Sequence, residues 1–222
     1  STLNRAGQLL GIIGGATALL GFGRSAVTAF NESAQASAQL EAGLRSTGNA
    51  VGLTSEAMKA QASALQELTT YDDDAIVGMQ SLLLTFTNVK DKIFTEATPA
   101  ILDLATRMGG DLNGAALQVG KALQDPITGM TALRRSGVSF DEAQQKVIKG
   151  LVETNRLGEA QTMILAELNK EFGGSAVASA QSGTGAWQQL SNAYGDVMED
   201  VGGLIVSMGQ GLLPVIRGAI TA

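Results

Sequence analysis

The amino-acid sequence predicts an all-α protein, in which a compact multi-helix central domain is flanked by long, apolar, glycine-rich helical arms. Hydrophobic residues make up 45% of the 222 residues, but aromatic residues make up only 4%, a composition that favours closely packed helices over a sheet sandwich. Apolar residues recur at spacings of three and four, and no segment shows a sustained strand-like alternation. Charged residues are concentrated in the middle of the chain, so both ends are apolar.

The N-terminal arm is predicted to be a helix within residues 1–48. No charged residue lies between Arg5 and Arg24. Small residues spaced four apart would share one face of this helix and let a second backbone approach closely. These residues are Gly7, Gly11 and Gly15. The second half of the arm continues at helical spacing, and Gly48 and Gly52 are expected to end it.

The central domain is predicted to cover residues 49–174 as a series of short helices. Thr54 and Asp72 are expected to cap two of them, because a short polar side chain can accept a hydrogen bond from the first helical turn. Pro99 is expected in the first turn of the next helix, since its fixed φ suits that position. The pair Gly109-Gly110 would end that helix.

Further helices are expected in the second half of this domain. Asp125 and Pro126 are predicted to be the cap and the first residue of one of them. Ser139 and Glu142 match a capping box, and the helix that follows is expected to turn four residues inward. These are Phe140, Ala143, Val147 and Leu151. One more apolar stripe is expected to end at Gly173-Gly174.

The C-terminal arm is predicted to cover residues 175–222. Two sets of residues recur every seven positions, which lets one helical face run along a partner helix. The first set is Gly195, Gly202 and Gly209, and the second is Tyr194, Val201, Met208 and Val215. Pro214 is expected to end or bend the helix. Trp187 and Tyr194, also seven apart, fit either packing anchors or an aromatic belt at a membrane interface.

The composition excludes several kinds of chemistry. The chain has no histidine and no cysteine, so disulfides, cysteine nucleophiles, histidine bases and ordinary zinc sites are excluded. A net charge of −6 without a basic stripe disfavours nucleic-acid binding, including sequence-specific binding. We therefore expect no catalytic residue, no cofactor and no metal.

Three local patterns could nevertheless suggest a site. Residues 72–74 are three aspartates, but the spacing of a calcium loop is missing, so a helix start is the preferred interpretation. Glu153 with Glu159, or Asp141 with Glu142, could suggest a glycosidase, but each lies among ordinary surface charges. The glycine pairs lack the strand and the Lys-Ser/Thr of a phosphate loop.

Ordered motifs in the middle of the chain carry a resemblance to a known family. Between residues 102 and 174 stand LDLATRMGGDLNGAALQVGKALQDPITGMTALRRSGVSF and then AQTMILAELNKEFGG, which SA follows. Residues 46–86 read STGNAVGLTSEAMKAQASALQELTTYDDDAIVGMQSLLLTF, and residues 186–202 read AWQQLSNAYGDVMEDVG. Together, in this order, these segments resemble the central region of tail tape measure proteins of long-tailed phages and prophages.

The resemblance implies a structural and assembly protein. Proteins of that family are mostly helical, are stored in the lumen of the tail tube, set the length of the tail and leave it during infection to assist DNA entry. It also implies partners: tail assembly chaperones in the host cytoplasm, tail tube and tail tip or baseplate proteins in the virion, and further copies of the chain, with a trimer favoured over a hexamer. After ejection, the host inner membrane or envelope would be a further location.

The chain is too short to be the ruler itself, because even one unbroken helix would span only roughly 330 Å. Its first residue is Ser1, so we interpret it as a segment of a longer protein that holds the measuring part elsewhere. Two alternative functions stay open. The apolar arms could form a membrane-inserting channel segment for DNA, with residues 6–23 at the lower margin of a bilayer span. The segment could also be an embedded cell-wall hydrolase, which the missing catalytic groups disfavour.

Overall fold

The computed structural model describes the backbone of residues 2–220 and the side chains of residues 21–210. Within that backbone the chain is helical and has no strand, so the predicted all-α class is confirmed. The helices are α1 (Thr2–Ser46), α2 (Ser55–Leu68), α3 (Asp73–Leu83), α4 (Asp91–Arg107), α5 (Leu112–Gln124), α6 (Pro126–Leu133), the 3₁₀ turn η1 (Arg134–Ser136), α7 (Glu142–Glu153), α8 (Leu157–Phe172), α9 (Ser175–Ala180) and α10 (Gly185–Ile220).

The chain divides into two compact units. The larger unit, residues 36–192, contains the end of α1, the helices α2 to α9 and the start of α10. The smaller unit consists of residues 1–35 with residues 193–222, and therefore of parts of α1 and α10. The predicted domain limits at residues 48 and 174 coincide with ends of helices, but both lie inside the larger unit.

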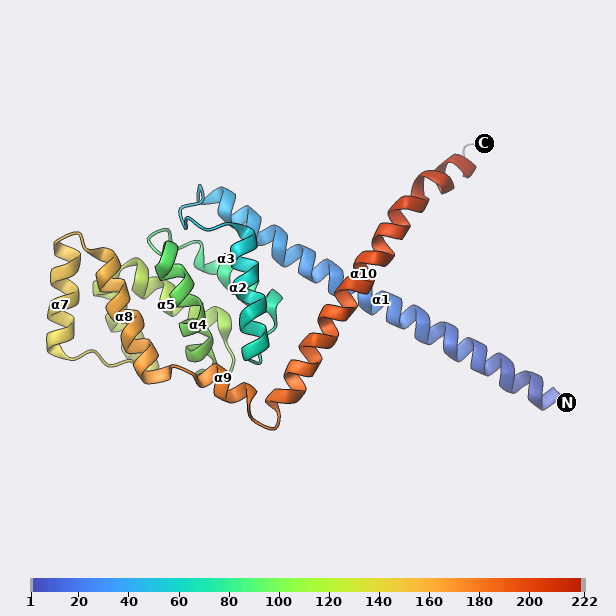
Figure 1. Cartoon of the computed structure of the whole chain (residues 1–222), viewed down its shortest axis with the longest axis horizontal. Helices are drawn as coiled ribbons and strands as arrows, with labels where there is room; N and C mark the ends of the chain where they lie inside the picture. The colour runs from blue at the N-terminus through green and yellow to red at the C-terminus, as the bar shows by residue number, and fades with distance from the viewer. Residues whose placement is uncertain (1, 221–222) are drawn as a thin grey trace. The chain divides into compact units, whose positions relative to one another are not determined.

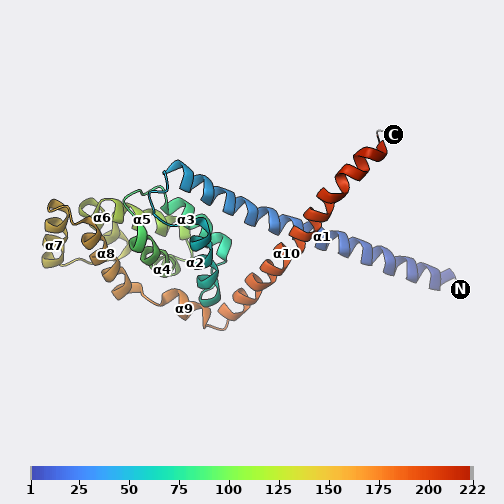
Figure 2. The same cartoon turned by 45° about the horizontal axis from the view of Figure 1, so that its top comes forward.

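The core of the larger unit is built around α4 and α5. Helix α4 packs against α5, α8 and α9, while α5 also packs against α3 and α6. Figures 1 and 2 show α4 and α5 between α8 on one side and α2 and α3 on the other. Large side chains from these helices are fully buried, each contributing roughly 1.5–3 kcal/mol by its removal from water. They include Phe94, Ile101, Leu104, Leu123 and Ile164.

Most predicted helix ends are confirmed. The hydroxyl of Thr54 accepts a hydrogen bond of 3.2 Å from the main-chain nitrogen of Ala57. The carboxylate of Asp125 caps α6, and Pro126 is the first residue of that helix. Gly109, Gly110 and Gly174 have positive φ, which glycine adopts without strain at a helix end.

Pro99 contradicts its prediction, because it lies in the interior of α4 rather than in its first turn. A proline there has no N–H to donate to the carbonyl four residues earlier, which belongs to Thr95. The side-chain amide of Gln61, on α2, donates a hydrogen bond of 2.7 Å to that oxygen instead. The neighbouring helix therefore supplies the donor that the proline lacks.

The predicted start of α7 is also wrong. The capping box is formed by Asp141 and Gln144, not by Ser139 and Glu142. Of the four residues predicted to face inward, Phe140 and Leu151 are buried as predicted, whereas Ala143 is exposed. Val147 is half exposed, and its neighbour Ile148 is fully buried.

Two other expectations about helix ends need correction. Asp72 occupies the residue before α3, but its side chain accepts no hydrogen bond from the first turn of that helix. Pro214 was expected to end or bend its helix; α10 continues beyond it to Ile220, so of these two alternatives the end at the proline is wrong.

Candidate functional site

Two of the motifs that carry the resemblance meet at one partly buried junction in the larger unit. The side-chain amide of Gln161, from AQTMIL on α8, is almost fully buried. It donates hydrogen bonds to the main-chain oxygens of Asn88, at 2.9 Å, and Leu123, at 2.8 Å. Leu123 belongs to the motif VGKALQDP, and Asn88 lies in the loop between α3 and α4. The side chain of Gln161 therefore joins its own motif to VGKALQDP and to this loop.

The same loop is held from α5. The main-chain nitrogen of Asn88 donates to the side-chain oxygen of Gln124 at 3.0 Å, and the side-chain amide of Asn88 donates to the main-chain oxygen of Gln124 at 3.1 Å. Gln124 is the glutamine of VGKALQDP. The glutamines of both motifs thus bind Asn88.

The glycines of this region allow close packing. A Cβ atom at Gly120 would overlap the ring of Phe86, the last residue of the SLLLTF segment. A Cβ atom at Gly129, on α6, would overlap the backbone of Ala122 on α5. Both glycines are therefore needed for the observed approach of their neighbours.

A second polar contact ties α7 to α8. The carboxylate of Glu167 is almost buried and accepts hydrogen bonds from Lys170 at 2.7 Å and from Gln144 at 2.6 Å. The hydrogen bond from Lys170 lowers the pKa of Glu167, and the one from Gln144 lowers it further. Elsewhere in the unit, burial raises the pKa of Tyr71, whose hydroxyl lies 3.0 Å from that of Thr106.

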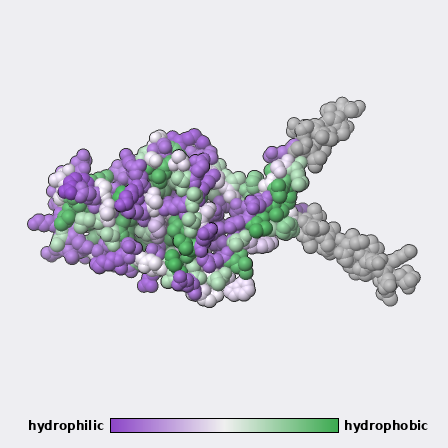
Figure 3. Space-filling model, viewed as in Figure 1, coloured by the Kyte–Doolittle hydropathy of each residue, from purple (hydrophilic) through white to green (hydrophobic). Residues whose placement is uncertain are grey.

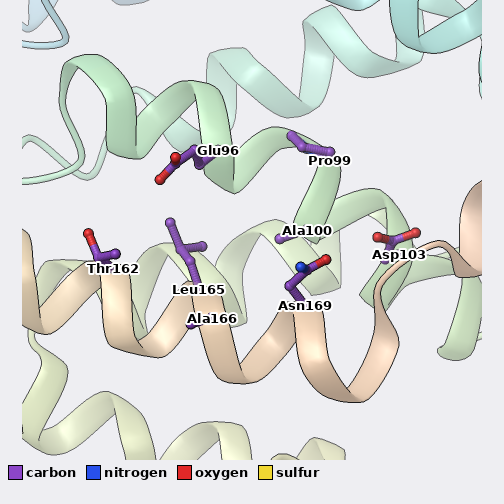
Figure 4. Close-up of a pocket in the computed structure, with 8 residues that line it drawn as sticks. All are labelled: Glu96, Pro99, Ala100, Asp103, Thr162, Leu165, Ala166 and Asn169. Atoms are coloured by element: carbon purple, nitrogen blue, oxygen red, sulfur yellow. The ribbon is translucent and has the colours of Figure 1, made fainter.

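A groove of about 340 Å³ lies between α4 and α8. Figure 4 shows Pro99 and Ala100 from α4 opposite Leu165, Ala166 and Asn169 from α8. Its acidic side chains already have partners. The carboxylate of Asp103 accepts hydrogen bonds from the main-chain nitrogens at the start of α9, and Glu96 forms an ion pair with Lys92. The groove thus offers a mainly apolar lining with acids engaged in structural contacts.

The carboxylates considered as catalytic candidates also make structural contacts. Glu159 pairs with Arg156, Glu153 pairs with Lys149, and Asp141 caps α7. At the start of α3, the carboxylate of Asp73 accepts a hydrogen bond from Ser63 at 3.1 Å.

In the smaller unit, α1 and α10 cross (Figures 1 and 2). Gly202 of α10 lies against α1. A Cβ atom at Gly202 would overlap the main-chain oxygen of Ala26 and lie 2.8 Å from the Cβ of Phe30. Ala26 is fully buried, and a Cβ atom at Gly203 would lie 3.2 Å from the ring of Phe30. One of the predicted packing glycines therefore lies at a contact between helices.

The other predicted glycines are placed differently. Gly195 and Gly209 have no atom within 4 Å of an added Cβ, so the helical repeat of seven does not give them the same environment as Gly202. Gly7, Gly11 and Gly15 lie in the first half of α1, outside the residues whose surroundings the structure describes.

Helix α10 turns polar and small residues toward its own chain. The side-chain amide of Gln189 donates to the main-chain oxygens of Glu67 and Thr69, and that of Asn192 donates to the oxygen of Thr70. Large apolar residues of α10 are exposed instead, and Figure 3 shows hydrophobic surface along this helix. They are Trp187, Leu190, Tyr194, Val197, Leu204, Ile205 and Met208.

Sequence reasoning found only part of this exposed set. The seven-residue repeat identified Tyr194 and Met208, but missed Leu190, Val197 and Leu204, which lie between the members of that repeat. The signal was available, because the spacings alternate between three and four. Exposure, however, could not be read from the sequence.

Among the described residues, no helix combines the length and the hydropathy needed to cross a bilayer. Comparison of the chain with protein-family models, with curated proteins and with solved structures gives no match.

Proposed function

We propose that this chain is the packed helical domain of a phage tail tape measure protein, and that its role is structural. The observation that carries the proposal is the convergence of the resembling motifs on one junction. Gln161 and Gln124 come from two of these motifs, and both hydrogen-bond Asn88. Motifs that are held together by packing are typical of an assembly domain, whereas a catalytic motif would direct polar groups toward a cavity.

The compact packing of the larger unit favours an assembly function over the measurement of tail length. Residues 36–192 fold back on themselves and pack as one unit. A helix of 45 residues such as α1 spans about 68 Å at 1.5 Å per residue. The measuring function therefore belongs to other parts of the protein, and this domain serves assembly.

The proposal places the chain in the lumen of the tail tube near the tip, with tail assembly chaperones binding it in the host cytoplasm beforehand. Its partners would be tube and tip proteins and other copies of itself. On ejection, it would leave the tail and reach the host envelope, where it would assist DNA entry.

Labelling of virions tests this proposal. The turn at Gly183 is exposed, and no atom lies within 4 Å of an added Cβ there, so a short epitope inserted after Gly183 should leave both units folded. In purified phage tails dissociated in denaturant, we expect the epitope antibody to detect the tagged chain on immunoblots, because an epitope in the tube lumen becomes accessible only after dissociation, with untagged particles as the control. In-frame deletion of residues 36–192 should abolish tailed particles. Absence of the epitope from dissociated tails, together with normal tails after the deletion, would overturn the proposal.

A further inference from the structure

A pocket of about 450 Å³ lies between the C-terminal end of α4, the helices α5 and α6, and the turn η1. Its lining combines apolar side chains with two cations. The apolar residues are Met108, Leu117 and Ala132, and the cations are Lys121 and Arg135. A pocket of this size can hold a small ligand or a few side chains of a partner.

The polar wall of this pocket is held by contacts within the chain. The side-chain amide of Gln118 donates a hydrogen bond of 3.6 Å to the sulfur of Met108, and its oxygen accepts a hydrogen bond from the hydroxyl of Ser136. Ser136 belongs to η1, which lies between the buried residues Leu133 and Val138. These contacts fix η1 against α5, so little has to be ordered when a ligand binds.

The two cations of the pocket have no acidic partner. In the part of the chain that the structure describes, no ion pair includes Lys121 or Arg135. Both residues are exposed, and the neighbouring Arg134 is also exposed and forms no ion pair there. Their charges are therefore available to an anion from outside the chain.

The acids nearest to these cations in sequence are engaged in capping helices. Asp111 accepts a hydrogen bond of 2.8 Å from the main-chain nitrogen of Gly114, and Asp125 accepts one of 2.7 Å from the hydroxyl of Thr128. Residues 104–140 contain these two acids and four cations, whereas the whole chain has a net charge of −6. A concave surface with an excess of positive charge attracts anionic ligands.

The composition of the lining indicates which anion fits. Arginine binds a carboxylate through two parallel hydrogen bonds, and lysine adds a compact charge. Leu117 is 39% exposed, so part of its apolar surface is available to a ligand. Covering that surface is favourable only for a ligand that brings an apolar group of its own. An acidic peptide segment, in which a glutamate or aspartate lies beside a leucine-sized residue, meets both requirements.

A nucleic acid fits this pocket less well. Binding to a phosphate backbone uses cations that follow the backbone along one face, because the affinity grows with the number of phosphates that are contacted. This pocket instead places its two cations beside apolar side chains. A phosphate backbone would leave the apolar lining without a complementary group.

We propose that this pocket binds an acidic, leucine-bearing segment of a partner protein. Lys121 and Arg135 hold a carboxylate of the segment, and Leu117 packs against the neighbouring apolar side chain. The inference goes beyond the structural role proposed above, because it rests on the pocket alone. Failure to find the chain in dissociated tails would leave the peptide binding intact, and loss of the peptide binding would leave the phage role intact.

Fluorescence anisotropy with the whole purified chain tests the proposal. The probe is a short fluorescein-labelled peptide that alternates leucine and glutamate, at an ionic strength of about 0.15 M, where distant surface charges are largely screened. We expect saturable binding. A peptide with glutamine in place of glutamate should bind more than about tenfold more weakly, because it has no carboxylate for the two cations. A peptide with serine in place of leucine should also bind more weakly, because it leaves the apolar lining uncovered.

Substitutions in the pocket separate its two parts. Lys121→Gln combined with Arg135→Gln should weaken binding of the leucine–glutamate peptide by more than about tenfold. Lys59→Gln combined with Lys146→Gln removes the same charge at residues that do not line the pocket, and should leave the binding unchanged. Leu117→Ser should weaken binding of the leucine–glutamate peptide but not that of the serine–glutamate peptide. Circular dichroism shows whether each variant keeps its helices.

Four results would overturn the proposal. The native chain could fail to bind the leucine–glutamate peptide, or bind the serine peptide equally well. The two double variants could weaken binding to the same extent, which would indicate attraction by net charge rather than by this pocket. A labelled DNA duplex could bind more tightly than the peptide and lose its binding in the Lys121→Gln, Arg135→Gln variant, which would assign the pocket to nucleic acid.

Discussion

The side-chain nitrogen of Gln61 lies 2.7 Å from the main-chain oxygen of Thr95, the acceptor that Pro99 leaves without a helical donor. The two residues are 34 positions apart and belong to α2 and α4. A proline in the interior of a helix costs about 3 kcal/mol, in part because one hydrogen bond is lost. The contact from α2 offsets that part and explains how α4 continues through Pro99.

This relationship predicts a coupling between Gln61 and Pro99. Gln61→Ala should lower the free energy of unfolding by about 1 kcal/mol in the native sequence, because the oxygen of Thr95 loses its donor. In a Pro99→Ala background the helix supplies its own N–H, so the same change should cost less. Urea denaturation of the four proteins in a double-mutant cycle measures the difference. Equal costs in both backgrounds would show that Gln61 does not substitute for the missing N–H.

At the junction around Asn88, we predict that one substitution lowers the free energy of unfolding by more than Gln61→Ala does. Gln161→Ala removes the donor from two main-chain oxygens, those of Asn88 and Leu123, and leaves them without this partner in the interior. We expect the free energy of unfolding to fall by about 3 kcal/mol, measured by urea denaturation. Thr162→Ala, on the exposed side of the same helix, is the control and should change it by less than about 0.5 kcal/mol. Similar effects of the two substitutions would contradict the importance of the junction.

Two glycines in helices should respond to alanine in opposite directions. Gly120→Ala forces a Cβ against the ring of Phe86, and the resulting overpacking should cost about 1–3 kcal/mol. Gly78→Ala, on α3, meets no atom within 4 Å and should stabilise the protein by about 0.5–1 kcal/mol through its helix propensity. Thermal unfolding measures the change in stability of each variant: the unfolding temperature should fall in Gly120→Ala and rise in Gly78→Ala. A stabilising Gly120→Ala would mean that Phe86 moves away without cost.

At the crossing of α1 and α10, two glycines of α10 should respond differently to alanine. Gly202→Ala places a Cβ against the main-chain oxygen of Ala26, and the two helices must separate to accommodate it. Hydrogen exchange of residues 21–35 should accelerate as a result. Gly195→Ala, on the same helix with open space around it, should leave that exchange unchanged. Unchanged exchange in Gly202→Ala would show that the crossing does not protect α1.

The contact between α7 and α8 predicts a dependence on pH. The hydrogen bond from Lys170 lowers the pKa of Glu167 below its ordinary value of 4.5, so the folded protein favours the ionised carboxylate. A lowered folded pKa stabilises the protein above the unfolded pKa, and this contribution disappears as the pH falls through the folded pKa. Stability should therefore drop less steeply below about pH 5 in Glu167→Gln than in the native protein. If the free energy of unfolding of the two proteins changed equally with pH, the lowered pKa of Glu167 would not contribute to stability.

Much of the local structure could be predicted from the sequence, because its causes are local. Thr54 and Asp125 cap helices through groups three residues away, and paired glycines end helices by adopting positive φ. Errors arose where two local signals competed. Ser139 and Asp141 both stand before α7, and only Asp141 forms the capping box. The inward face of α7 also differs at one step, because packing buries Ile148 and leaves Val147 half exposed.

For the surface of α10, the sequence predicted the spacing of its residues but not which of them are covered. The seven-residue repeat in α10 is visible in the sequence, because helical periodicity places its residues along one side of the helix. Whether that side is covered is a property of the fold. Gly195, Gly202 and Gly209 share a spacing, yet of the three only Gly202 meets another helix, since two straight helices that cross touch over a short length.

The sequence by itself determined the all-α class, most of the helix ends and the heptad spacing of α10, because these depend on interactions within a few residues along the chain. The tertiary structure alone decided that Gln61 would compensate for Pro99 and that Gln161 would bind Asn88, 73 residues away. It also decided that α10 would present its large apolar residues to solvent. Such contacts follow from how whole helices pack, and the packing depends on all of their side chains at once.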